Sequence, residues 1–152
     1  ITNIGGTSAD MGNAVFVAAM LELPTMAFFS KMSEKINCGT LIKFSILMFC
    51  VKHALTYFAT NMIMIYLAQV CQMFAYALFI PASVYYVNEK IALADRVKGQ
   101  SLVTTSMTLS GVFANFAGGI MLDALGVGHV LLAGIILSIV GAVIVILTTE
   151  KV

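Results

Sequence analysis

Residues 130–147 read VLLAGIILSIVGAVIVIL, and this stretch decides the fold class. It contains no charged residue and no proline, and its one hydroxyl side chain is Ser138. A helix of about 20 mostly apolar residues is long enough to cross the hydrocarbon core of a bilayer. Strands of a membrane β-barrel would alternate apolar and polar residues over about 10 positions, and these residues do not. The stretch therefore predicts a transmembrane helix.

Four further apolar segments have similar length, at residues 11–30, 41–57, 62–87 and 101–122. The chain as a whole is 61% hydrophobic and 10% charged, whereas a soluble domain carries about 25% charged residues. We therefore expect an all-α integral membrane protein with a bundle of five transmembrane helices over residues 11–147. Residues 1–10 are then an outer loop and residues 148–152 a short tail.

The basic residues predict the orientation of this bundle. Seven of the eight lie beside the first and third connections or at the end of the chain, and the exception, Lys52, lies inside a span. Because Lys and Arg gather on the cytoplasmic side of membrane proteins, we expect the chain to start outside and to end in the cytoplasm. The membrane that we expect is a bacterial inner membrane.

Composition argues against several other classes of protein. The net charge of +1 and the absence of a basic cluster argue against a nucleic-acid partner. The three cysteines show neither metal-ligand spacing nor an even-numbered disulfide framework. The sequence holds no clustered His, Asp, Glu or Cys of the kind that a membrane-embedded enzyme needs. We expect no enzyme, no bound metal and no cofactor.

Two charged residues, Glu22 and Lys52, lie inside predicted spans. An ionisable group in hydrocarbon costs about 2.5–3.5 kcal/mol on insertion scales, so each needs a reason. At 1.5 Å per helical residue, Glu22 is about 16 Å and Lys52 about 12 Å from the outer surface. An ion pair between antiparallel neighbours is then geometrically available. It would form either a charged site facing a water-filled cavity or a buried pair that only fixes the helix register.

Amide side chains accompany this pair. Gln69, Gln72 and Tyr76 are spaced i, i+3 and i+7, so they share one helical stripe, and Gln72 is expected about 15 Å deep, level with Glu22. Asn115 in the fourth span is expected at a similar depth. Amides donate and accept hydrogen bonds, as recognition of a solute requires, but they also join helices to one another in membranes. Both interpretations stay open.

Other positions predict mechanical roles. Prolines inside a span remove a backbone hydrogen bond and can bend the helix, while glycines let helices approach closely. Such residues suit helices that rock, and they are equally common in ordinary packing. The positions concerned are Pro24, Pro81, Gly111, Gly118 and Gly119.

Several features together resemble the major facilitator superfamily. Glu22–Pro24 reads E-L-P, a basic hairpin follows at residues 31–43, and Lys52 comes thirty residues after Glu22. The connection at residues 86–102 is similar to the one between helices ten and eleven of that family, and Gly118–Gly119 with Asp123 resembles its end of helix eleven. The resemblance is narrower to the branch of lactose-permease-like, nucleoside and phenylpropionate proton symporters.

The resemblance implies that residues 11–147 correspond to helices eight to twelve of a twelve-helix fold. The preceding helices of the same protein, the solute and the lipid bilayer would then be its partners. It also implies that Glu22 binds solute or the coupling proton and that Lys52 is its basic partner. Lys52 stands where the family usually has Arg, and Gln72 and Ala75 stand at the positions of the coupling His and Glu of the lactose permease. A relay of the lactose-permease kind is therefore not expected.

The function that we expect is secondary active transport, with proton-coupled uptake of a small organic solute such as a sugar, nucleoside or aromatic acid. One alternative is efflux of a drug or metabolite by proton antiport, because nothing in these spans fixes direction. An alternative from another class is a membrane helper or scaffold subunit without transport, which would not need charges at mid-membrane depth.

Overall fold

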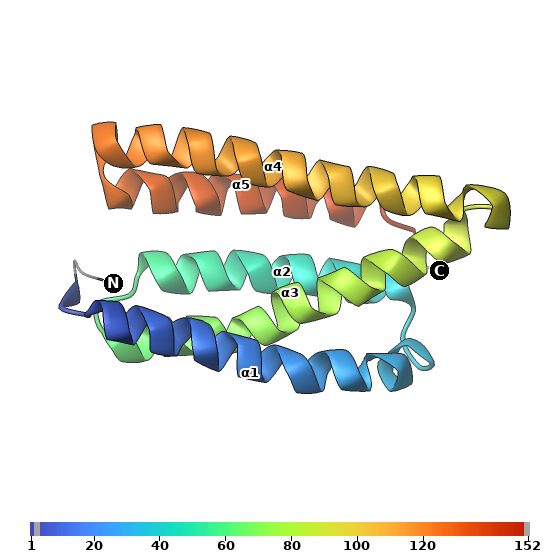
Figure 1. Ribbon diagram of the computed structural model, residues 1–152, viewed down its shortest axis with the longest axis horizontal. Helices are drawn as coiled ribbons and strands as arrows, with labels where there is room; N and C mark the ends of the chain where they lie inside the picture. Colours follow the sequence, from blue (N-terminus) through green and yellow to red (C-terminus); the bar gives the residue numbers. More distant parts are fainter. Residues whose placement is uncertain (2–3, 151–152) are drawn as a thin grey trace.

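The computed structural model describes residues 1 and 4–150 and consists of long helices joined by short connections (Figure 1). The elements are α1 (Ser8–Ser33), α2 (Cys38–Tyr57), α3 (Met62–Lys90), a short 3₁₀ helix η2 (Leu93–Asp95), α4 (Arg96–Leu125) and α5 (Val127–Thr148). Each of the five long helices encloses one predicted span and continues beyond it at one or both ends. All five are long and apolar enough to cross a membrane. The predicted all-α membrane fold with five spans is confirmed.

Local sequence signals set where helices begin and end. Thr7 and Asp10 form a capping box at the start of α1, in which Thr7 Oγ1 accepts from the backbone N–H of Asp10. Asn61 caps α3 by accepting from the N–H of Met64 at 3.1 Å. Gly126, with φ at 81°, separates α4 from α5. This left-handed conformation favours glycine, and it lets the chain reverse there without a longer loop.

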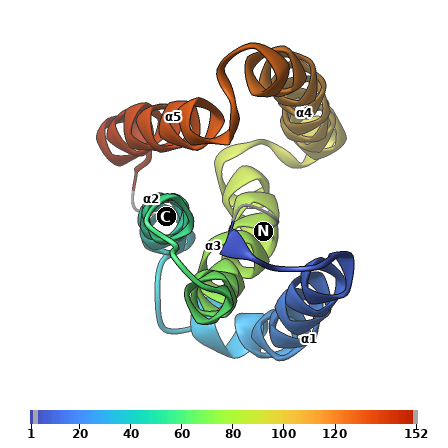
Figure 2. The same cartoon turned by 90° about the vertical axis from the view of Figure 1, so that its left-hand side faces the viewer.

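Helix α3 is central to one half of the bundle, since it packs on both α1 and α2, while α5 packs on α2 and α4 (Figure 2). The face of α3 toward its neighbours carries small buried residues, among them Ala68, Ala75 and Ala82. Small side chains let helices approach closely in a membrane. The buried cluster between α1, α2 and α3 consists of Phe29, Leu41, Ile42, Leu78 and Ala82.

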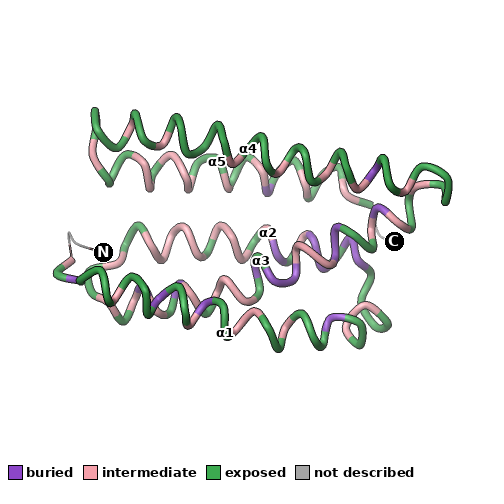
Figure 3. The backbone as a smooth tube through the Cα atoms, in the orientation of Figure 1, coloured by how far each residue is buried: buried purple, intermediate pink, exposed green. Residues whose placement is uncertain are grey.

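Helix α4 is the least covered helix of the bundle. Gly99 is its one buried residue, and large apolar side chains such as Leu102 and Phe116 are 70% and 71% exposed. Figure 3 shows α4 as mostly exposed, in contrast to the buried segments of α3. On a membrane protein, such an exposed apolar helix surface fits contact with lipid or with further helices.

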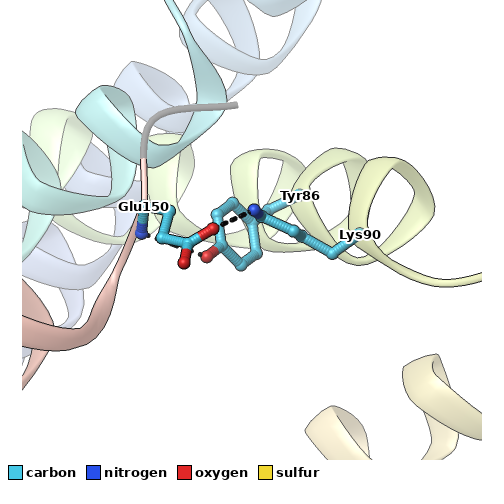
Figure 4. Close-up of polar contacts among 3 residues, drawn as sticks. All are labelled: Tyr86, Lys90 and Glu150. Atoms are coloured by element: carbon cyan, nitrogen blue, oxygen red, sulfur yellow. Dashed lines mark hydrogen bonds and ion pairs between the residues drawn. The ribbon is translucent and has the colours of Figure 1, made fainter.

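Residues after α5 tie the end of the chain to α2 and α3. Glu150 forms an ion pair with Lys90, and its backbone N–H donates to the hydroxyl of Tyr86 at 3.3 Å (Figure 4). Lys90 holds the pKa of Glu150 below its usual range, first through this hydrogen bond and then through its charge. The contact needs Gly39, because a Cβ there would clash with the carbonyl oxygen of Glu150.

We predict that Gly39→Ala lowers the melting temperature of the purified protein. The added methyl group displaces the backbone of Glu150, at a cost of about 1–3 kcal/mol for forcing extra volume into a tight contact. The control is Gly141→Ala, since a Cβ on Gly141 would meet no heavy atom within 4 Å. Equal melting temperatures for the two variants would contradict the close contact at Gly39.

Candidate functional site

Three polar side chains from three helices meet at mid-helix positions. Lys52 on α2 donates through Nζ to Oε1 of Gln72 on α3. Gln72 in turn donates through Nε2 to Oε1 of Glu22 on α1, at 3.2 Å. All three residues are half-buried. The result is a continuous hydrogen-bonded chain, Lys52–Gln72–Glu22, that crosses from α2 through α3 to α1.

The amide of Gln72 suits its place between opposite charges. A primary amide has an acceptor oxygen and a donor nitrogen, and here the oxygen faces the ammonium while the nitrogen faces the carboxylate. Hydrogen bonds in which one partner is ionised are about twice as strong as neutral ones. Gln72 therefore stabilises both charges at once, although they lie on helices that flank α3.

The structure does not show the direct ion pair between Glu22 and Lys52 that their similar depths made geometrically available. The structure brings Glu22 and Lys52 to the same level, but over the described residues the ion pairs are Lys90–Glu150 and Lys98–Asp95. The physical reason is the position of α3, which packs on α1 on one side and on α2 on the other. The estimate of depth treated α1 and α2 as direct neighbours, whereas Gln72 stands between their charges.

Gln69 does not join this chain. It lines a separate cavity of about 320 Å³ with Thr56 and Tyr57 of α2 and with Val127 and Leu131 of α5. Both glutamines therefore face α2, but Gln72 also reaches α1, whereas the cavity lined by Gln69 extends to α5. The proposed role of Gln69 at the solute site stays a prediction.

Tyr76 lines a third region, an apolar cavity of about 420 Å³ between α2, α3, α4 and α5. His53, the neighbour of Lys52, lies on the same cavity, and its Nδ1 is 2.8 Å from the carbonyl oxygen of Phe49. A carbonyl oxygen can only accept, so Nδ1 is the donor in this hydrogen bond. Tyr76 and His53 thus lie together, on a cavity distinct from the one lined by Gln69. The sequence pattern did not single out this pairing, because its two residues come from different helices.

The remaining predicted positions lie apart from the chain of three. Asn115 is exposed on α4, and its side chain makes no hydrogen bond within residues 4–150. A Cβ on Gly111, Gly118 or Gly119 would meet no heavy atom within 4 Å. Pro24 and Pro81 lie inside α1 and α3, which continue through them. Their mechanical roles stay predictions.

The described residues hold no group of three His, Cys, Asp or Glu side chains that could bind a metal ion. Their polar chemistry inside the predicted spans is instead that of hydrogen bonding and of charge. The carboxylate, the amide and the ammonium concerned are those of Glu22, Gln72 and Lys52.

Comparison with known families decides the class of protein. The family model described as Major Facilitator Superfamily matches residues 1–152. The chain belongs to the Major Facilitator Superfamily. Membership in this superfamily agrees with the five membrane-spanning helices and indicates a transporter. No curated protein and no solved structure matches the chain in the corresponding searches.

We predict that Gln72→Ala destabilises this superfamily member more than Gln69→Ala does. Loss of the Gln72 amide leaves two half-buried charges without their shared partner, and hydrogen bonds to charged groups contribute about 1.5–3 kcal/mol each before allowance for exposure. Gln69 is the matched control, because it is the same residue type one turn away on α3 and has no hydrogen bond to the charged pair. Melting temperatures in detergent measure the difference. If both variants lost the same stability, Gln72 would have no special bridging role.

Proposed function

We propose that the protein is a secondary active transporter that takes up a small organic solute together with protons by alternating access. The single observation that carries the proposal is the hydrogen-bonded chain Lys52–Gln72–Glu22 across three helices. Charges at this depth are costly in a membrane and are typical of ion and substrate pathways. A chain that served packing alone would not need a carboxylate and an ammonium.

The chain suggests how a proton and a solute could be coupled. The charged carboxylate of Glu22 accepts from Gln72, whereas a protonated carboxyl group also carries an O–H donor. Protonation removes the charge that strengthens this hydrogen bond, so it weakens the link between α1 and α3 and also changes the donors offered to a solute. Because alternating access moves helices around a site near the midplane, the same contacts respond to both events. The hydroxyls or amides of a sugar, nucleoside or aromatic acid are the groups that Gln72 would recognise.

We further propose a bacterial inner membrane, with the start of the chain outside and its end in the cytoplasm. Lys31, Lys35 and Lys43 lie at the same end of the bundle as Lys90 and Arg96, as the alternating direction of the helices requires (Figure 1). Basic residues mark the cytoplasmic side. The exposed apolar face of α4 would contact lipid or the other helices of the same protein. The proton would be the coupling ion, with no further cofactor.

We predict that Glu22→Gln abolishes proton-driven accumulation but retains part of solute counterflow. The amide cannot exchange a proton, yet it keeps the size of the side chain and its ability to hydrogen-bond. Purified protein in liposomes is first screened with sugars, nucleosides and aromatic acids, with a pH-sensitive dye inside. Accumulation and counterflow are then compared for the active solute.

The control is Glu89→Gln, which removes an exposed carboxylate near the end of α3. Full accumulation by Glu22→Gln would contradict the proton role. The same assay decides between uptake and the alternative, efflux by antiport, because solute and proton then move in opposite directions.

Replacing both charges separates transport from the scaffold alternative. We predict that the double variant Glu22→Leu with Lys52→Leu reaches the membrane, since no unpaired charge remains, but loses transport completely. A helper subunit would keep its activity in this variant, because it does not need charges at mid-membrane depth. Retained biological activity in cells that express the double variant would favour the helper.

A further inference from the structure

A second polar region lies where α3 ends and α4 begins. A pocket of about 500 Å³ is bordered there by six polar side chains, Asn88, Arg96, Gln100, Ser101, Thr104 and Thr105. It lies near the end of α3 and the beginning of α4, whereas Gln72 lies in the middle of α3. Neither the charged chain nor the proposed proton coupling uses it.

Arg96 is the unusual residue of this pocket. Its Nε is buried and has no hydrogen-bond partner within the described residues, and the ion pairs found there do not include Arg96. The other two basic residues of this connection are neutralised, Lys98 by Asp95 at 2.8 Å and Lys90 by Glu150. A buried donor without a partner costs about 1–3 kcal/mol, more when it is charged. The guanidinium of Arg96 thus carries a positive charge for which the described residues supply no counter-ion.

Hydrogen bonds fix one of the side chains that line the pocket, and others keep unused hydrogen-bond donors. Gln100 Nε2 donates to the carbonyl oxygen of Val84 at 2.9 Å and to Oδ1 of Asn88 at 3.4 Å, which joins α4 to α3. The side-chain hydroxyls of Thr104 and Thr105 make no hydrogen bond of their own within the described chain. Arg96 is also the first residue of α4, so the positive end of the helix dipole lies beside it.

The geometry points to a site for a phosphate oxyanion, and we propose that Arg96 is its central ligand. The planar guanidinium binds phosphate oxygens through two parallel N–H donors, and threonine hydroxyls can complete the contacts. Basic pockets between transmembrane helices on the cytoplasmic side bind anionic lipid headgroups. The phosphate is therefore carried either by an anionic phospholipid or by a small soluble molecule.

The test measures how phosphate compounds change the melting temperature of the purified full-length protein in detergent. The three probes are phosphatidylglycerol, zwitterionic phosphatidylcholine as a lipid control, and inorganic phosphate. Arg96→Gln removes the central ligand. Lys35→Gln is the matched control, because it removes one exposed lysine at the same end of the bundle that has no ion pair within the described residues.

We expect phosphatidylglycerol to stabilise the wild-type protein and Lys35→Gln equally, with an apparent affinity at least about tenfold weaker for Arg96→Gln because a bidentate contact is lost. A response to inorganic phosphate that is lost in Arg96→Gln alone would also support the site and assign it to soluble phosphates. If Arg96→Gln does not fold, the pair Thr104→Val with Thr105→Val tests the same pocket and should weaken the response. The proposal is overturned if neither anionic probe stabilises the wild-type protein more than phosphatidylcholine does, or if the variants of the pocket respond like the wild type.

Discussion

The amide of Gln72 is the constraint on which the middle of this bundle depends. It accepts from Lys52 and donates to Glu22, so two charges on separate helices are stabilised by one neutral side chain on the helix between them. In hydrocarbon, each of these charges alone would be costly. Helix α3 can occupy its central place because its small buried residues allow close packing, and that place brings Gln72 within reach of both partners. The close packing of α3 thus explains both the arrangement of the helices and the position of the site.

Much of the fold follows from the sequence because each span carries its own signal. Residues 130–147 are apolar throughout, so hydropathy and length alone predict a membrane helix there. The ends of the helices are predicted less well, since a helix continues past the hydrocarbon boundary as long as its backbone hydrogen bonds and caps permit. Helix α4 begins at Arg96, before the predicted start at residue 101, because polar residues there are compatible with a helix outside the bilayer core.

Three of the six predicted site residues, Glu22, Lys52 and Gln72, lie together in the structure, but the hydrogen bonds that join them were not predicted. Depth, counted at 1.5 Å per residue, placed Glu22, Lys52 and Gln72 at similar levels without any structure. Depth says nothing about which helices are neighbours. Gln72 separates the two charges because α3 packs next to both α1 and α2. In the same packing arrangement, Gln69 and Tyr76 line other cavities. In the sequence, Arg96 indicated the orientation and belonged to the connection that resembles the family. Its lack of a partner could not be predicted, because it depends on which residues lie nearby in three dimensions.

A double-mutant cycle between Glu22 and Lys52, repeated with Gln72 replaced, tests the bridging role most directly. The variants are Glu22→Gln, Lys52→Met and their combination, each with Gln72 and with Gln72→Ala, and the free energy of unfolding in detergent is measured for all. Residues in one hydrogen-bonded network show coupling energies of about 0.5–3 kcal/mol. We predict coupling in this range when Gln72 is present and a loss of most of it in the Gln72→Ala background. The same coupling in both backgrounds, or none in either, would contradict the account.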